Sequence, residues 1–187
     1  DAFFLPSDFS AIAVIDVASD RVLDVDPSTP EPDGIVLEGR NPFTGGQGLM
    51  LDAGGNILVN DVGSFGDLTD GGIERIDPRT MKSLGFLMTE AELGGNLTDF
   101  VVVDDRTGYA VVTDLRFRNS LVRFDPGERR VVETILVSDE YLVDLELDDV
   151  VQVVPARRED FVERSCLRRR AGIAVEDDAG IGGQRIE

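Results

Sequence analysis

The side chains of this chain that could do chemistry are almost all carboxylates. The sequence holds 37 aspartates and glutamates against 18 lysines and arginines, one cysteine and no histidine, with a formal net charge of −19. Without histidine, Ser-His-Asp catalysis, Cys-His catalysis and histidine metal sites are excluded. Cys166 therefore lacks the base that activates a catalytic thiol, and we expect it to be structural. Cation binding and a merely solvated acidic surface are both compatible with the charge.

One stretch, residues 61–72, concentrates carboxylates among glycines. It contains Asp61, Asp67 and Asp70 and superficially resembles a calcium loop, but it lacks the ligand spacing and the closing glutamate of helix-loop-helix sites. We therefore interpret it as a mobile surface loop. Asp61 and Asp114 each end an apolar run, and we predict that both form turns by accepting nearby backbone amides.

Four short apolar segments stop at an aspartate that is followed by a turn. The aspartates are Asp16, Asp77, Asp125 and Asp177, at intervals of 61, 48 and 52 residues. Such a period, made of strands and turns, is typical of β-propeller blades. The repeat therefore predicts an architecture, but it does not by itself predict an activity.

A second repeated element, a strand, a turn and another strand, lies between the first ones. It is clearest in residues 97–114, recurs in residues 46–61, and recurs more loosely in residues 142–156. Its Asp and Gly residues supply the backbone conformations of hairpin turns. The runs 101–103 and 111–112 are apolar without alternation, which indicates inner strands covered on both faces.

We predict a single all-β domain over residues 1–187, a partial or open β-propeller of about three four-stranded blades plus an outer strand pair. The outer pair covers residues 10–25, and the blades cover residues 48–88, 97–136 and 141–187, the last of them irregular. Residues 27–47 are predicted to be a long connection, and helix signals are poor. The predicted blade strands are 48–51, 56–61, 72–77 and 82–88; 99–103, 109–114, 119–125 and 131–136; and 142–147, 150–154, 172–176 and 184–187.

The arginine-rich segment 157–170 fits the repeat poorly. It holds six arginines and no repeat signature. We interpret it as an irregular connection, with a short helical insert or a degraded or mistranslated blade as alternatives. Its acidic neighbours and its lack of interleaved aromatic residues argue against a nucleic-acid patch.

Two parts of the chain resemble known propeller families. Residues 11–23, Ala-Ile-Ala-Val-Ile-Asp-Val-Ala-Ser-Asp-Arg-Val-Leu, resemble the repeats of YVTN-type propellers of bacterial and archaeal surface proteins. Residues 99–114, which end in Thr-Asp, resemble blades of the gluconolactonase/regucalcin-like and the yellow/royal-jelly propellers. The resemblance covers most of residues 10–136 and implies blade architecture, on which function varies widely.

The likeness to the lactonase-type blade also implies a metal site. Asp99 stands where that family places a metal-binding Asn, and Asp144 stands at the same point of the next blade. The resemblance implies that both carboxylates face a common axis and hold Ca²⁺ or another divalent cation, which would polarise a lactone carbonyl or activate water. The preceding blade departs from the pattern with Gln47 and Gly48, and no acidic general base is identifiable. The alternative is that each aspartate caps a strand start and bonds backbone amides.

We therefore expect a non-enzymatic binding or scaffold module of an extracytoplasmic or cell-surface protein, with no cofactor and no catalytic residues. Its partner would be a protein, a glycan or a small ligand. A metal-dependent lactonase-like hydrolase is the alternative, and a truncated propeller without independent function is a third. The acidic charge argues against nucleic acid as a partner, and no apolar run reaches the roughly 20 residues of a membrane span. An open arc would expose its end blades, so self-association through them is expected.

Overall fold

The structure is a computed structural model of the chain, and it describes residues 9–30, 33–42, 49–147, 151–156, 166–169 and 172–176. Beyond Tyr141, the side chains described are those of Leu142 and Leu145, and the remainder is described as backbone. The described residues form three four-stranded and two two-stranded sheets, all antiparallel, and one helical turn. The all-β prediction is confirmed.

The first two four-stranded sheets are simple meanders in which each strand pairs with the next along the chain. Their strands lie within a few residues of the predicted ones, so these two predictions are confirmed. The first sheet contains β5 (Met50–Leu51), β6 (Ile57–Asp61), β7 (Gly72–Asp77) and β8 (Lys82–Thr89). The second contains β9 (Asn96–Val102), β10 (Gly108–Thr113), β11 (Asn119–Asp125) and β12 (Arg130–Ser138).

The third four-stranded sheet corrects the sequence prediction. Its strands are β13 (Tyr141–Leu147), β14 (Val151–Ala156), β15 (Cys166–Arg169) and β16 (Gly172–Glu176). Because β15 lies inside the arginine-rich segment, residues 166–169 are not an irregular connection, and residues 172–176 form the fourth strand rather than the third. Hydrogen bonds between strand backbones do not depend on side-chain polarity. A strand can therefore form in an arginine-rich segment whose composition does not indicate one. The predicted strand 184–187 lies outside the described residues.

The N-terminal part forms two small sheets. The hairpin of β2 (Val14–Asp16) and β3 (Arg21–Leu23) confirms the predicted outer strand pair. The first strand of that pair, predicted over residues 11–16, is divided, because β1 (Ala11–Ile12) pairs instead with β4 (Ile35–Val36). The prediction that residues 27–47 are only a connection is therefore wrong at β4.

A single helical turn, α1 (Glu90–Leu93), joins the first four-stranded sheet to the second. Thr89 caps it by accepting the Glu92 amide, and the Glu92 side chain accepts the Thr89 amide in return. This reciprocal pair is a capping box. One turn is too short to show helical periodicity, which is why the sequence analysis missed it.

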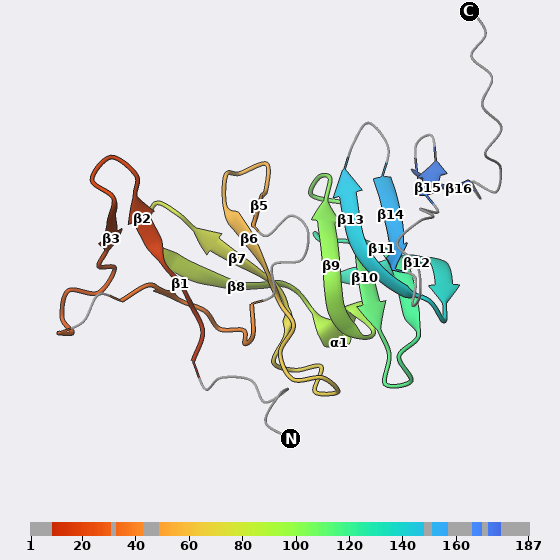
Figure 1. Cartoon of the computed structure of the whole chain (residues 1–187), viewed down its shortest axis with the longest axis horizontal. Coiled ribbons are helices and arrows are strands. Elements are labelled where there is room, and N and C mark those ends of the chain that lie inside the picture. Colours follow the sequence, from red (N-terminus) through yellow and green to blue (C-terminus); the bar gives the residue numbers. More distant parts are fainter. Residues whose placement is uncertain are drawn as a thin grey trace, which may run out of the picture.

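The sheets follow one another along the long axis of the molecule in chain order (Figure 1). Apolar side chains fill each space between them: Ile73 and Phe124 belong to the core between the first and second sheets, and Val101 and Leu145 to the core between the second and third. The second sheet is covered on both faces, as its non-alternating strands predict. In Figure 1, β2–β3 and β15–β16 lie at opposite ends, so the described sheets form no closed ring.

Candidate buried carboxyl site

Three carboxyl side chains, those of Asp61, Glu74 and Glu90, have 0% of their surface exposed. Asp61 ends β6, Glu74 lies within β7, and Glu90 begins α1. Asp61 lies opposite Gly72 in the β6–β7 ladder, and side chains two residues apart on a strand share a face. Asp61 and Glu74 therefore lie diagonally on one face of the first four-stranded sheet.

The Glu74 carboxylate fastens the segment after β4 to this face. Its Oε1 accepts the Glu38 amide at 3.0 Å, and its Oε2 accepts the Gly39 amide at 2.8 Å. Hydrogen bonds to an ionised acceptor are stronger than neutral ones. This buried side chain thereby helps to hold residues 33–42 against the sheet, together with a backbone bridge between Pro42 and Asp61.

The neighbouring Asp61 has a different environment. Neither of its carboxyl oxygens accepts a hydrogen bond from any described residue, and a Cβ on Gly39 would overlap its carboxyl group. Burial raises the pKa of Asp61 to about 9, and the neighbouring Glu74 carboxyl and the charge of Glu90 act in the same direction. At neutral pH Asp61 is therefore protonated, and its hydroxyl can donate to Glu74.

Glu90 connects the first sheet to the second. Its Oε1 accepts the Leu97 amide at 2.6 Å, and its Oε2 accepts the Asn96 side-chain amide at 3.1 Å. Burial raises the pKa of Glu90 to about 8, although these two hydrogen bonds oppose the shift. Glu90 thus positions the start of β9, and it is a second buried carboxyl that titrates above neutrality.

The next sheet shows that a four-stranded meander of this kind does not require carboxyls at these positions. Asp77 and Asp125 lie at the same place, before the turns that follow β7 and β11. Counted back from them, Glu74 corresponds to Val122. Asp61 pairs with Gly72 as Val112 pairs with Ser120, so Asp61 corresponds to Val112. The buried pair replaces two valines, both of which are buried in the second sheet.

The prediction that Asp61 forms a turn is therefore wrong, whereas it is confirmed for Asp114. Asp114 accepts the backbone amides of Arg116 and Arg118 at 2.8 and 3.0 Å. The turn role is also confirmed for Asp16, Asp77 and Asp125, whereas Asp177 lies outside the described residues. The signal that could have found the buried pair is Glu74 itself, at a position where the repeat places a valine.

Asp99 is buried in β9, and both of its oxygens accept backbone amides. Oδ1 accepts the Phe100 amide at 2.8 Å, and Oδ2 accepts the Leu145 amide at 2.6 Å. Asp144 takes the matching backbone position, opposite Val154 in β14, with a register shift just before it as before Asp99. The structure thus brings the two aspartates to the first strands of adjacent sheets, but the side chain of Asp144 lies outside the described part.

As a metal ligand, Asp99 would have to bind through oxygens that already accept these two hydrogen bonds. Among the described residues, no group of three or more Asp, Glu or Cys side chains is placed to hold a metal ion. Two aspartates of the 61–72 stretch bond within their own loop, since Asp70 accepts from Ser64 and Asp67 accepts from Thr69.

Within the ranges that the structure describes, no helix has the length and apolar character needed to cross a bilayer. Comparisons with known protein families, with curated proteins and with solved structures found no match for this chain.

Proposed function

We propose that this chain is a non-enzymatic binding or scaffold module of the β-propeller type, which contacts its partner through loops at one end of its sheets. The observation that carries the proposal is an exposed aromatic pair. The rings of Phe65 and Phe117 stack with centroids 5.0 Å apart and planes 12° apart. Phe65 is 41% exposed and Phe117 is 69% exposed.

The two phenylalanines come from corresponding loops, β6–β7 and β10–β11, of consecutive sheets. Leu115, which is 68% exposed, lies against Gly66 of the first loop, where a Cβ would come within 3.1 Å of its Cδ2. We call Phe65, Leu115 and Phe117 the loop-end patch. Apolar side chains that gather on a surface indicate an interaction site more often than scattered ones do.

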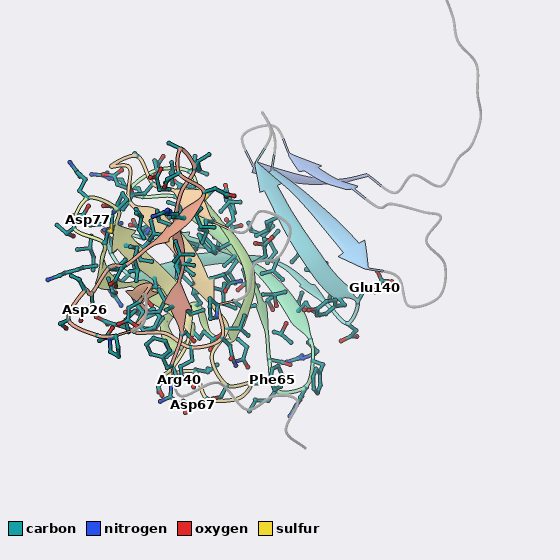
Figure 2. All side chains as sticks on the ribbon, turned by 60° about the vertical axis from the view of Figure 1, so that its left-hand side comes forward. Asp26, Arg40, Phe65, Asp67, Asp77 and Glu140 are labelled. Carbon is teal, nitrogen blue, oxygen red and sulfur yellow. The ribbon has the colours of Figure 1, made fainter. Side chains whose placement is uncertain are left out.

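The loop that carries Leu115 and Phe117 is held rigidly. Asp114 accepts two hydrogen bonds from the Arg118 guanidinium, at 2.9 and 2.8 Å, in addition to the amides of this turn. A preorganised loop loses little conformational entropy when it binds. Figure 2 shows Phe65 toward the same end of the molecule as Arg40 and Asp67, so the patch has both apolar and charged neighbours, as binding surfaces on proteins do.

The N-terminal sheets support the scaffold part of the proposal. Ile15 lies directly opposite Val22 in the β2–β3 hairpin, and the two side chains are 58% and 53% exposed. On the other face of β2, Val14 packs against the core that contains Ile35. A sheet with apolar residues on both faces is typical of one that is covered on both sides. We propose that a second copy of the chain covers this outer face, which a size measurement in solution tests.

The binding proposal is tested with a printed glycan array and a displayed peptide library. The parent protein is compared with a Phe65→Ala/Phe117→Ala double variant and with a Val137→Ala control, which removes an exposed apolar side chain from β12. We expect the double variant to lose at least about tenfold in affinity for the parent's binders, as truncated hot-spot residues do, while the control retains them. Thermal unfolding of each variant establishes that it is folded.

Equal binding by all three proteins, or no binding by the parent, would contradict the proposal. Lactone hydrolysis that requires added divalent metal and disappears in Asp99→Ala would favour the hydrolase instead. Non-cooperative unfolding of the isolated parent would favour a truncated propeller without independent function.

A further inference from the structure

If Asp61 and Glu74 were both ionised, two neighbouring negative charges would lie in the interior of the protein. Two adjacent buried carboxyl groups are strongly disfavoured from ionising together when no cation lies beside them. The charged residues on the side of the surrounding elements that faces Asp61 are Glu74 on β7, Glu90 on α1, Asp67 and Asp70 in the β6–β7 loop, and Glu38 and Arg40 after β4. Arg75, next to Glu74 on β7, points to the opposite face of the sheet, where it pairs with Asp52 at 3.1 Å. The residues on the Asp61 side are all acidic except Arg40. The charge of Arg40 acts on Asp67, whose pKa is lowered first by hydrogen bonds from the Thr69 hydroxyl and amide and then by Arg40.

We propose that Asp61 and Glu74 share one proton, and that this shared proton forms a pH-sensitive clasp holding residues 33–42 on the first four-stranded sheet. The proton resides on Asp61, because Glu74 already accepts two backbone amides while Asp61 accepts no hydrogen bond from the described residues. The Asp61 hydroxyl donates to the Glu74 carboxylate. The clasp is thus a chain of hydrogen bonds from Asp61 through Glu74 to the Glu38 and Gly39 amides.

Asp61 holds its proton more tightly when the clasp is closed than when it is open, and this difference sets the direction of the pH response. Burial raises the pKa of Asp61 to about 9 in the closed state, whereas a hydrated aspartic acid has a pKa near 3.9. Opening therefore releases one proton, and the opening equilibrium constant rises about tenfold per pH unit between these two values. The clasp is closed most firmly in acid and loosens as the solution becomes alkaline.

The opening would extend beyond residues 33–42. Three backbone hydrogen bonds join this segment to the loop that carries Phe65: Arg40 N–H to Asp70 O, Gly63 N–H to Arg40 O, and Val62 N–H to Asn41 O, at 3.2, 2.8 and 3.2 Å. Loss of the clasp therefore also loosens one side of the loop-end patch. The clasp itself does not depend on that patch binding a partner.

Amide hydrogen exchange measured by NMR on the full chain between pH 5 and 9 tests the proposal. In the parent, we expect the opening constant at the Glu38 and Gly39 amides, after correction for intrinsic exchange, to rise about tenfold per pH unit. In Asp61→Asn we expect no such rise, because an amide of the same shape donates to Glu74 without titrating. Asp125→Asn, at an exposed turn where Asp125 accepts the Glu128 amide, is the matched control and keeps the parent behaviour.

An internal reference separates the clasp from general loosening. The Leu97 amide is held by Glu90, so it keeps a pH dependence of its own in Asp61→Asn. The same slope at Glu38 and Gly39 in parent and variant, or no slope in the parent, would overturn the proposal. So would protection of these amides by added Na⁺ or Ca²⁺, because a metal cation would then occupy the place of the proton.

The parent protein alone supplies a second test that does not require the variant to fold. The ¹³C resonance of the Asp61 carboxyl is followed through a pH titration. A midpoint above pH 7 supports the clasp. A midpoint near the ordinary value of about 4 would refute it, because Asp61 would then be ionised at neutral pH.

Discussion

The Asp99 carboxylate in β9 accepts the Leu145 amide of β13 at 2.6 Å, so one side chain joins the first strands of two neighbouring sheets. Strands of different sheets share no ladder, so their buried backbone amides need other acceptors. Asp99 supplies one, and its other oxygen accepts the Phe100 amide of its own strand. The stacking of the second and third sheets thus depends on a polar link inside an apolar core.

Replacing Asp99 by alanine removes this link. We expect Asp99→Ala to lower the free energy of unfolding by about 1–3 kcal/mol, since the Leu145 amide remains buried without its acceptor. Asp99→Asn should cost less, because its carbonyl oxygen still accepts one amide. Urea unfolding measures both, and equal stability of all three proteins would contradict the assignment.

The same variant addresses the calcium site that the lactonase likeness implies. Calorimetric titration of the parent with Ca²⁺ should give heat that is lost in Asp99→Ala if Asp99 is a ligand. If the titration gives no heat, Asp99 does not bind Ca²⁺ and its role is to accept hydrogen bonds. Unfolding and calorimetry thereby separate the link between sheets from metal binding.

The free energy of unfolding should decrease at high pH because of the buried carboxyls, and at low pH because of the exposed ones. Burial raises the pKa of Asp61 to about 9 and that of Glu90 to about 8, so their contribution is full below their unfolded pKa near 4 and is lost as pH rises through these values. Hydrogen bonds from Ser19 and from backbone amides lower the pKa of the turn residue Asp16, and hydrogen bonds likewise lower that of Asp114. The stability that these two supply is lost as pH falls through their folded pKa.

We therefore expect the midpoint of thermal unfolding to be highest in mildly acidic solution, between about pH 4 and 6, and to fall toward pH 9. Asp61→Asn and Glu90→Gln should each flatten the alkaline arm and leave the acid arm in place. Scanning calorimetry over pH 3–9.5 measures both arms. An unfolding midpoint that keeps rising through pH 8 would contradict the raised pKa values of Asp61 and Glu90.

Arg129, in the turn between β11 and β12, reaches back to α1. Its Nε and Nη2 donate to the two oxygens of Glu92 at 2.8 Å each, and its Nη1 donates to the Phe86 carbonyl. We expect Arg129→Lys to destabilise nearly as much as Arg129→Ala, about 1 kcal/mol or less for a half-exposed pair, because lysine lacks the guanidinium fork. Chemical denaturation of both variants checks this, and full retention of stability by the lysine variant would show that charge alone suffices.

Thr89 caps α1 from the end of β8. Thr89→Ala should cost about 1 kcal/mol, the usual value for a lost N-cap, whereas Thr89→Ser should restore most of it because serine keeps the hydroxyl. Urea unfolding of the two variants provides the comparison. Equal loss in alanine and serine would show that the threonine methyl group, rather than the cap, carries the effect.

Gly72 begins β7 at a φ of 149°, where a Cβ would overlap the Met88 carbonyl oxygen and lie 2.8 Å from the Thr89 Cα. Because these are backbone atoms of a paired strand, the neighbours cannot move aside cheaply. We expect Gly72→Ala to cost at least about 2 kcal/mol. Gly54→Ala, in the exposed β5–β6 turn, is the control and should cost under about 1 kcal/mol. Similar unfolding curves for the two variants would be inconsistent with the described packing.

Local sequence pattern was enough to predict the meanders of the first two four-stranded sheets and the turns at Asp16, Asp77, Asp114 and Asp125. Apolar runs and turn residues encode these features because they depend on contacts between residues close in the chain. The burial of Asp61 beside Glu74 could not be predicted in this way, because the Glu38 and Gly39 amides that complete the site come from a segment about 35 residues away along the chain. The pairing of β4 with β1 and the strand at Cys166 were likewise decided by backbone partners, and hydrogen bonds between distant backbones leave no mark on side-chain pattern.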